Sequence, residues 1–303
     1  MNTIDRYCSG AAWGIASREA FFPKSDALVY RCNEGFLAML SERSDHWGVM
    51  LLPLDASWFL GCPLVGPLPD AVLARFLDQT PGPNWDTLLI SGLQQGSPLF
   101  SRLLQVVQLR HEAYKGPPAI RRIADLREGA DAYLARRPRS FRANLRRLKR
   151  RAQEAGLSIQ ILGADYSGEG VESLFLRMMD VERRGWKGQA GVGVNAGSMR
   201  RFYHRLIRMQ APLGQTRAIL VTHEGQDVGY MLGGVAFNTF RGYQFSFDDE
   251  YRALGPGNLM QWVMIEALCE EGVAFYDLGT DMEYKRRWAD FAMETVSLLV
   301  PRK

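Results

Sequence analysis

The sequence predicts a mixed α/β fold made of two halves. Its length of 303 residues is about twice that of a typical single domain. Short apolar runs separated by Gly, Asn, Asp and Ser, a pattern typical of strands, occur in both halves of the chain. Longer stretches with apolar residues at helical spacing lie between them. Together these observations favour mixed sheets covered by helices.

The composition is that of an ordinary globular protein, with 47% hydrophobic and 23% charged residues. The four cysteines are scattered, with no C-x-x-C pair and no Cys/His cluster, so neither a zinc site nor a disulfide framework is expected. The N-terminus lacks a basic segment followed by an apolar run, and no stretch approaches the roughly 18 apolar residues that would span a bilayer. We therefore expect a soluble, cytoplasmic protein without a metal.

In the first half, expected strands outnumber expected helices. Pro63 would confine a strand in its region to a sheet edge or a bulge. Asp70 is expected to cap the helix that follows it, and Pro98 to begin another. Strands are expected at residues 27–30, 35–40, 48–52, 58–66 and 85–90, and helices at 70–77 and 98–109.

A strongly basic helix connects the halves over residues 136–156. Nine Lys or Arg and no acid lie within residues 136–151, so the rest of the chain sums to 4 − 9 = −5. One apolar stripe runs along this helix, and Gly156 stands where a helix C-terminus favours glycine. The stripe consists of Phe141, Leu145, Leu148, Ala152 and Ala155. The basic faces fit either a solvated helix or a surface that binds the phosphates of a substrate or of nucleic acid. Phe141 is the only aromatic residue of this helix, which favours a solvated helix or a substrate contact over a nucleic-acid site.

The second half contains a strand, two helices, a long hairpin and then the stretch at residues 243–288. In that stretch a strand is followed by a Gly-rich turn, a nearly all-apolar helix and another strand. Backbone N–H groups converge at such a turn where the helix dipole is positive, which makes an anion site. Arg252 adds a guanidinium at its entrance. Strands are expected at residues 158–162, 218–222, 227–237, 243–247, 274–278 and 294–300, and helices at 170–184, 198–210 and after 258.

This order of elements resembles the GNAT acyltransferase fold, whose pyrophosphate turn has the pattern [R/Q]-x-x-G-x-[G/A]. Residues 252–257, R-A-L-G-P-G, fit that pattern at the expected place. More specifically, the chain is similar to the BioF2-like (CelD-type) acetyltransferases, which are relatives of the FemABX aminoacyl transferases with two GNAT-like halves. The matching segments are residues 85–88, 97–98, 140–148, 182–188, 247–251, 255–259, 276–279 and 283–288.

The resemblance implies three parts. Residues 1–135 would be a degenerate GNAT-like half without a pyrophosphate turn, 136–156 the basic connecting helix, and 157–303 the acyltransferase domain. It also implies an acyl-CoA co-substrate, with acetyl-CoA as the expected donor, and direct attack by an amine in a ternary complex. The acceptor would be a small molecule or an envelope or polysaccharide precursor. The expected donor-binding residues are Ser246, Phe247, Arg252, Gly255, Pro256, Gly257, Asn258 and Leu259.

Acyl transfer to an amine also needs a base and an acid for the departing thiolate. The candidate bases are Asp277, Asp281, Glu283 and Glu182. Asp277 ends an apolar strand, where desolvation would favour the protonated carboxyl. It could equally cap a turn before Gly279. The resemblance implies that Lys285 polarises the acyl carbonyl or binds donor phosphate, against the alternative of a surface cation. Tyr284 and Tyr251 could protonate the thiolate or be core aromatics. The resemblance also implies substrate contacts from Glu182, Trp186, Lys187, Asp248 and Tyr251.

Two other functions fit the same sequence. Kinship with FemABX proteins and the basic helix would suit a transferase that uses aminoacyl-tRNA. A non-catalytic GNAT-like scaffold could instead bind a polyanion through the same helix. Each of the four histidines is expected to be structural, because none is spaced from a nucleophile or a second metal ligand as catalytic or metal-binding histidines are.

Overall fold

The structure is a computed structural model that describes residues 5, 7–79, 83–166, 170–185, 188, 190–191 and 193–302. Its contacts divide the chain into two compact units. The first unit comprises Met1–Ile120 with Met293–Lys303, and the second unit comprises Arg121–Ala292. The sequence predicts a boundary after residue 135, whereas this division falls between Ile120 and Arg121, inside a strand.

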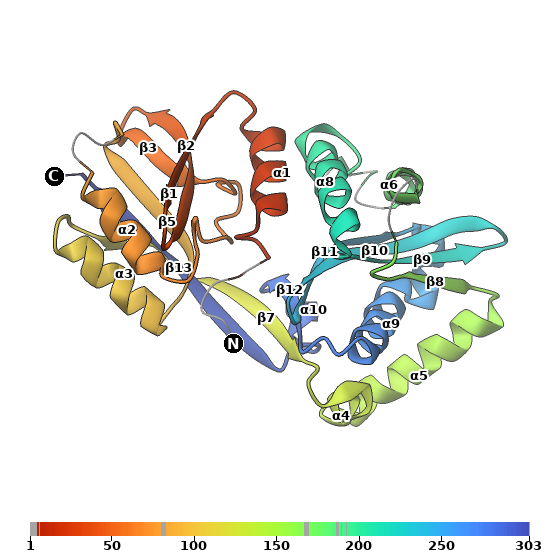
Figure 1. The fold of residues 1–303 in the computed structure, drawn as a ribbon. Helices are drawn as coiled ribbons and strands as arrows, with labels where there is room; N and C mark the ends of the chain where they lie inside the picture. Colours follow the sequence, from red (N-terminus) through yellow and green to blue (C-terminus); the bar gives the residue numbers. More distant parts are fainter. Residues whose placement is uncertain are drawn as a thin grey trace. The chain divides into compact units, whose positions relative to one another are not determined.

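The first unit contains a mostly antiparallel sheet in the order β1-β2-β3-β5-β13 (Figure 1). Only the β3–β5 pair is parallel among these neighbours. Helices α2 and α3 lie on one side of the sheet and α1 on the other (Figure 1). The bounds are α1 Ala11–Phe21, β1 Asp26–Cys32, β2 Gly35–Ser44, β3 Gly48–Pro53, β4 Leu64–Val65, α2 Pro69–Leu77, β5 Thr87–Gln94, α3 Pro98–Gln108, β6 Tyr114–Lys115 and β13 Phe291–Pro301. The mixed α/β class expected from the sequence is confirmed.

Two expectations for the first unit need correction, and one of its helices was not expected. Of the strand expected at residues 58–66 only β4 forms, because Phe59 takes a left-handed conformation with φ of 55° and the chain turns there. The N-cap of α2 is Leu68, and Asp70 lies in the first turn, where it pairs with Arg102. Helix α1 was not expected, since its interior contains Gly14 and its N-cap has no side-chain hydrogen bond.

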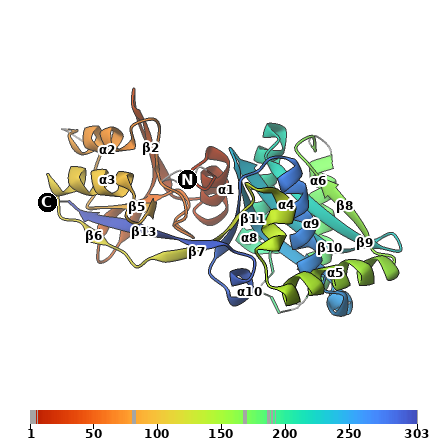
Figure 2. The same ribbon diagram turned by 90° about the horizontal axis from the view of Figure 1, so that it is seen from below.

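The second unit contains a sheet in the order β7-β12-β11-β10-β9-β8. Helices α6 and α8 cover one face of it, and α9 covers the other with α4 and α5 beside it (Figures 1 and 2). The bounds are β7 Ala119–Asp125, α4 Gly129–Ala135, α5 Arg139–Glu154, β8 Ser158–Leu162, α6 Gly170–Arg184, α8 Gly197–Gln210, η1 Ala211–Leu213, β9 Thr216–His223, β10 Gln226–Ala236, β11 Thr239–Phe247, η2 Asp249–Leu254, α9 Pro256–Glu270, β12 Phe275–Thr280 and α10 Glu283–Arg286. Among the helices that the structure describes, none combines the length and the hydrophobicity of a transmembrane span.

The basic helix, α5, packs on α9 through its apolar stripe. Leu145, Leu148 and Ala152 are buried, and Gly156 takes a φ of 70° just beyond the C-cap, so the predicted stripe and terminator are confirmed. The last strand, β13, forms at the expected place but pairs with β5 of the first unit. The chain therefore begins and ends in the first unit, and the second unit is an insertion between them.

Candidate functional site

The candidate site is centred on the place where β11 and β12 stop pairing. The two strands run parallel, and their register contains three pairs: Thr239 with Phe275, Phe240 with Tyr276, and Arg241 with Asp277. Beyond Arg241, β11 continues to Phe247 while pairing with β10 on its other side. A register shift between Leu232 and Gly233 of β10 accompanies this change. The strands thus diverge within the second unit.

The chain turns from β11 into α9 through η2 and Gly255. Asp248 caps η2 by accepting a hydrogen bond from Glu250 N at 3.3 Å. Gly255 has φ 63° and ψ 46°, a left-handed conformation that favours glycine, and a Cβ there would lie 2.8 Å from Leu148 Cδ2. Helix α9 then begins at Pro256, which suits a first helical position. Conformation and the packing of α5 both account for a glycine at this turn.

The first turn of α9 faces the diverging part of β11. Gly257 is the second helical residue, and a Cβ there would lie 3.1 Å from Phe245 Cε2. Gly257 and Asn258 are partly exposed, whereas Pro256 and Leu259 are buried. The N–H groups of a first helical turn have no acceptor within the helix, so this end favours an anion.

Arg252 lies at the entrance of the turn, as expected from the sequence. Its side chain is 62% exposed and pairs with Asp249 at 2.8 Å. An exposed pair of this kind contributes about 0–1 kcal/mol, so an incoming phosphate could replace Asp249 at little cost.

Tyr284 lies beside the same segment of β11, and Lys285 lies at the end of β12. The Tyr284 ring is 6.3 Å from that of Phe245, edge to face, and burial raises the pKa of Tyr284 above its usual value. Lys285 Nζ donates to the Thr280 carbonyl at 3.1 Å, and a Cβ on Gly279 would lie 3.4 Å from that nitrogen. Both side chains therefore occupy the end of β12 that faces the divergence.

Asp277 is buried between two arginines. Its carboxylate pairs with Arg121 and, at 2.7 Å, with Arg241, and it accepts a hydrogen bond from Gly279 N at 2.8 Å. All three charged side chains are at most 6% exposed. Desolvation alone favours a protonated carboxyl, but two guanidinium partners favour the ionised one. The hydrogen bond to Gly279 also matches the structural alternative, a turn-capping residue.

Glu182 is fully buried on α6 and has neutral partners. Val194 N donates to Oε1 at 3.0 Å, and the Tyr230 hydroxyl donates to Oε2 at 2.9 Å. Burial, followed by the nearby Glu182 carboxylate, raises the pKa of Tyr230 well above its usual value. Tyr230 is opposite Ser246 in the β10–β11 register, so their side chains share one face of the sheet. The Ser246 hydroxyl is buried and has no hydrogen-bond partner in the part of the chain that the structure describes.

Other sequence candidates have structural partners. Arg286 and Arg122 hold the pKa of Asp281 well below its usual range. Asp248 pairs with Arg184 at 3.0 Å in addition to capping η2. Glu283 lies in the short helix α10 without a hydrogen bond among the described contacts, and Phe247 is partly buried at the end of β11. Trp186 and Lys187 lie outside the described residues.

Tyr251 packs against the β9–β10 hairpin. Its hydroxyl lies 2.8 Å from His223 Nδ1, and the two rings are in edge-to-face contact. His204 likewise lies 2.7 Å from Glu172. Both contacts fit the structural role expected for the histidines.

Sequence reasoning did not single out Arg121, Arg241 and Tyr230. Each lies within a strand, where an inward-facing charged or hydroxyl group is unusual. The sequence did contain a clue to the Arg241–Asp277 pair. Arg241 precedes the segment that diverges, and Asp277 lies near the end of the strand predicted to follow α9. Among the described residues, no group of three or more His, Cys, Asp or Glu could hold a metal ion.

Comparisons with known proteins identify a related domain and several related folds. The model of an acetyltransferase (GNAT) domain matches residues 139–286, a segment that contains the divergence, the Gly255 turn and Lys285. No curated protein matches the chain by sequence.

Several solved structures have a similar fold across almost the whole chain. FemX matches with a TM-score of 0.63 and 12% identity, over 95% of this chain and 91% of that chain. A conserved protein of unknown function from Bacteroides thetaiotaomicron VPI-5482 matches with a TM-score of 0.58 and 12% identity, over 95% and 89%. L-PGS from Bacillus licheniformis matches with a TM-score of 0.57 and 13% identity, over 92% and 84%. The chain therefore has a FemX-like fold, and its residues 139–286 match a GNAT acetyltransferase domain.

Proposed function

We propose that this chain is an acyl-CoA-dependent N-acyltransferase of the BioF2-like kind, with acetyl-CoA as donor. The observation that carries the proposal is the end of β11–β12 pairing at Arg241, followed by the Gly255 turn and the first turn of α9. The divergence gives the donor's pantetheine arm a place beside β11, and the helix end suits a pyrophosphate. The match of residues 139–286 to a GNAT domain supports the same reading.

The donor would be held by β11, the turn and α9. In this proposal Ser246 and Phe247 line the arm, and Arg252 leaves Asp249 to bind phosphate. The N–H groups of Gly257 and Asn258 at the start of α9 bind the pyrophosphate, and Pro256, which has no N–H, contributes only its fixed conformation. Gly255 N and Leu259 N donate to the carbonyls of Arg252 and Gly255, so these two residues shape the turn. Lys285, at the end of β12, would polarise the acyl carbonyl or bind a donor phosphate.

The reaction is a direct transfer. The neutral amine attacks the thioester carbonyl, the C–N bond forms, and the C–S bond breaks. One proton leaves the amine, and one proton must reach the departing thiolate. Tyr284 is assigned as the acid for the thiolate, because its ring lies beside Phe245 at the divergence.

Glu182 is assigned as the proton acceptor. Of the candidate carboxylates, Asp277 is held between Arg121 and Arg241, and Arg286 and Arg122 hold the pKa of Asp281 well below its usual range. Glu182 instead accepts from a backbone N–H and the Tyr230 hydroxyl, and it is buried. The amine's proton would reach it through Tyr230, which lies opposite Ser246 of the donor strand.

Donor binding is the first test. Isothermal titration and thermal unfolding with CoA and acetyl-CoA should show a single site, with stabilisation of about 2.7 kcal/mol at a hundredfold excess over Kd. Absence of binding by any acyl-CoA would refute the proposal.

Catalysis is tested by release of free CoA thiol from acetyl-CoA with a panel of amines. Glu182→Gln should lower kcat/KM by about 10²–10⁴-fold without changing acetyl-CoA affinity. Glu172→Gln is the matched control, because Glu172 lies on the same helix and pairs with His204 at the surface. Equal loss in both variants, or none in Glu182→Gln, would reject the assignment of the base.

An aminoacyl-tRNA-dependent transferase is the second candidate. Arg139, Arg142, Arg146 and Arg151 of α5 have no ion pair among the described residues, which suits a polyanion. If tRNA is the donor, binding should weaken steeply with salt, and Arg146→Glu should lower both affinity and salt slope. Arg208→Glu on α8 is the control. Salt-dependent tRNA binding without CoA binding would replace the first proposal with the second, and binding of a polyanion without turnover of any donor would favour a scaffold.

A further inference from the structure

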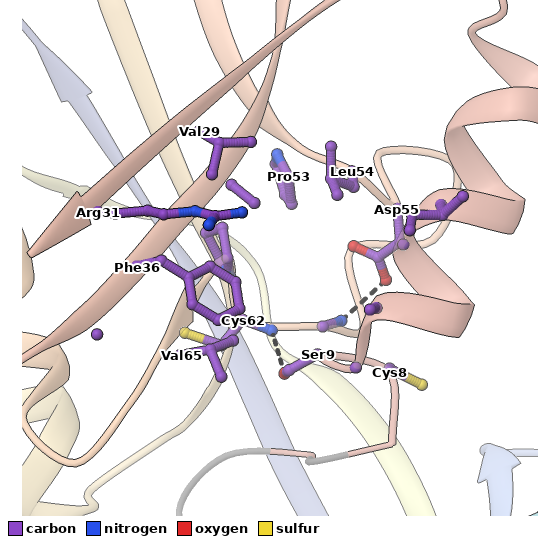
Figure 3. Close-up of a pocket in the computed structure, with 18 of the residues that line it drawn as sticks. Cys8, Ser9, Val29, Arg31, Phe36, Pro53, Leu54, Asp55, Cys62 and Val65 are labelled. Atoms are coloured by element: carbon purple, nitrogen blue, oxygen red, sulfur yellow. Dashed lines mark hydrogen bonds between the residues drawn. The ribbon is translucent and has the colours of Figure 1, made fainter. Parts of the chain in front are cut away.

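A pocket in the first unit lies outside the proposed acyl-transfer site. Its volume is about 620 Å³, within the range of roughly 300–1,000 Å³ typical of small-molecule sites. Residues that line it come from the start of α1, from β1 and β2, and from the chain between β3 and β4 (Figure 3). The proposed reaction uses none of them.

The walls of the pocket are mainly apolar. Val29, Phe36, Pro53, Leu54 and Val65 all line it (Figure 3). Val29 is 52% and Phe36 36% exposed, although both are large apolar side chains on sheet strands. Apolar surface left uncovered around a concave site favours a ligand with a hydrocarbon body.

Among the described residues that line the pocket, Arg31 supplies the one permanent charge. It lies on β1, and its guanidinium extends into the pocket (Figure 3). Within the described parts of the chain, no ion pair to Arg31 is found. A cation beside an apolar cavity favours a ligand with an anionic group.

Asp55 lies on the wall across from Arg31 (Figure 3). Its Oδ2 accepts hydrogen bonds from Trp13 Nε1 at 3.3 Å, Leu60 N at 3.0 Å and Gly61 N at 2.8 Å. Burial raises the pKa of Asp55 to about 7, and the nearby Asp5 acts in the same direction. Below pH 7 the carboxyl is therefore mostly neutral, and the pocket carries a net positive charge.

In the part of the pocket lining that the structure describes, the other titratable side chains are thiols. Burial raises the pKa of Cys62 to about 12, so that thiol is uncharged near neutral pH. Cys8 and Cys32 also line the pocket, and neither forms a disulfide. Among the described residues, Arg31 and Asp55 are the basic and acidic side chains that line the pocket, and Asp5 lies near Asp55.

We propose that this pocket binds a small organic monocarboxylate with an apolar body, whose carboxylate pairs with Arg31. The hydrocarbon part lies against the apolar walls, and the neutral Asp55 carboxyl leaves the ligand's charge unopposed. When Asp55 ionises, its negative charge repels the ligand's carboxylate. Ligand binding therefore weakens as pH rises through about 7.

The test is isothermal titration of the full chain with octanoate at pH 6. Octanoate should bind at one site, and Arg31→Gln should weaken it at least fivefold. Arg43→Gln is the matched control, an exposed arginine on β2 outside the pocket lining, and should leave Kd unchanged. Ala38→Phe, which fills the pocket from β2, should abolish octanoate binding. No octanoate binding, or equal binding by Arg31→Gln, overturns the proposal.

Two further arms identify the ligand class. Octan-1-ol and octylamine should bind at least fivefold more weakly than octanoate; equal binding of either would show that the site does not select a carboxylate. Octanoate affinity should fall severalfold between pH 6 and 8, and Asp55→Asn should remove this dependence. Affinity that rises with pH would refute the role of Asp55 and the pocket charge. Because the donor site lies in the second unit, acetyl-CoA binding and octanoate binding can fail independently.

Discussion

The substitution Asn258→Asp separates donor binding from folding, because it should change the two in opposite directions. Asn258 is the third residue of α9 and is partly exposed. A carboxylate in the first turn of a helix interacts favourably with the helix dipole, by about 0.3–1 kcal/mol. We therefore expect the second unit to unfold about 1–4 °C higher than in the wild-type protein.

The same charge should oppose the donor's pyrophosphate. At roughly 6 Å and an effective dielectric constant of about 20, two unit charges repel by about 3 kcal/mol. That corresponds to roughly a hundredfold rise in the Kd for CoA. Pantetheine, which has no phosphate, should bind the variant and the wild-type protein equally.

Calorimetric titration and thermal unfolding of the same samples measure both effects. Asn238→Asp is the control, since Asn238 is exposed in the β10–β11 turn and receives the same charge. An unchanged Kd for CoA in Asn258→Asp, together with a raised melting temperature, would show that the pyrophosphate does not lie at this helix end. The Gly255 turn would then be only a structural feature.

Three other predictions concern buried or half-buried groups. Asp277→Asn leaves Arg121 and Arg241 without their shared anion, so the free energy of unfolding should fall by about 3–5 kcal/mol in denaturant titration, and a loss below about 1 kcal/mol would contradict the ion-pair role. Tyr284→Phe should lower kcat and leave the Kd for acetyl-CoA unchanged, with the loss smallest for donors whose leaving thiol is more acidic; a uniform loss across donors would rule out proton donation. The pKa of Asp55 is about 7 in the folded protein and about 3.9 in the unfolded chain, so the folded protein binds this proton more tightly. The free energy of unfolding therefore falls as pH rises from about 4 to 7, by up to about 4 kcal/mol in total. The stability of Asp55→Asn relative to wild type should therefore rise with pH across that window, and a flat difference would contradict the raised pKa.

Much of the second unit could be predicted from the sequence, because its patterns are local. The α6 helix, the β9–β10 hairpin and the Gly156 terminator of α5 follow from apolar spacing and glycine conformation within one segment. The turn at Gly255 was also found, since its sequence pattern specifies both a left-handed residue and a helix start.

The first unit was harder, because its elements depend on contacts with distant segments. Helix α1 has weak local signals and is held by packing such as that of Trp13 on Trp58. The strand expected over residues 58–66 is mostly a turn, where Asp55 accepts hydrogen bonds from Leu60 N and Gly61 N. Local propensity does not report such a hydrogen-bonded turn.

By itself, the sequence determined the mixed α/β class, the basic helix and the glycine turn before α9. These depend on residue type and spacing along one stretch of chain. Only the tertiary structure decided that β13 pairs with β5, that Asp277 has Arg121 and Arg241 as partners, and that Glu182 meets Tyr230. Those pairings join residues far apart in the chain, and their charge and burial exist only once the strands and helices have packed. The choice between Asp277 and Glu182 as a base depends on that packing, because the partners of a carboxylate decide how readily it takes a proton.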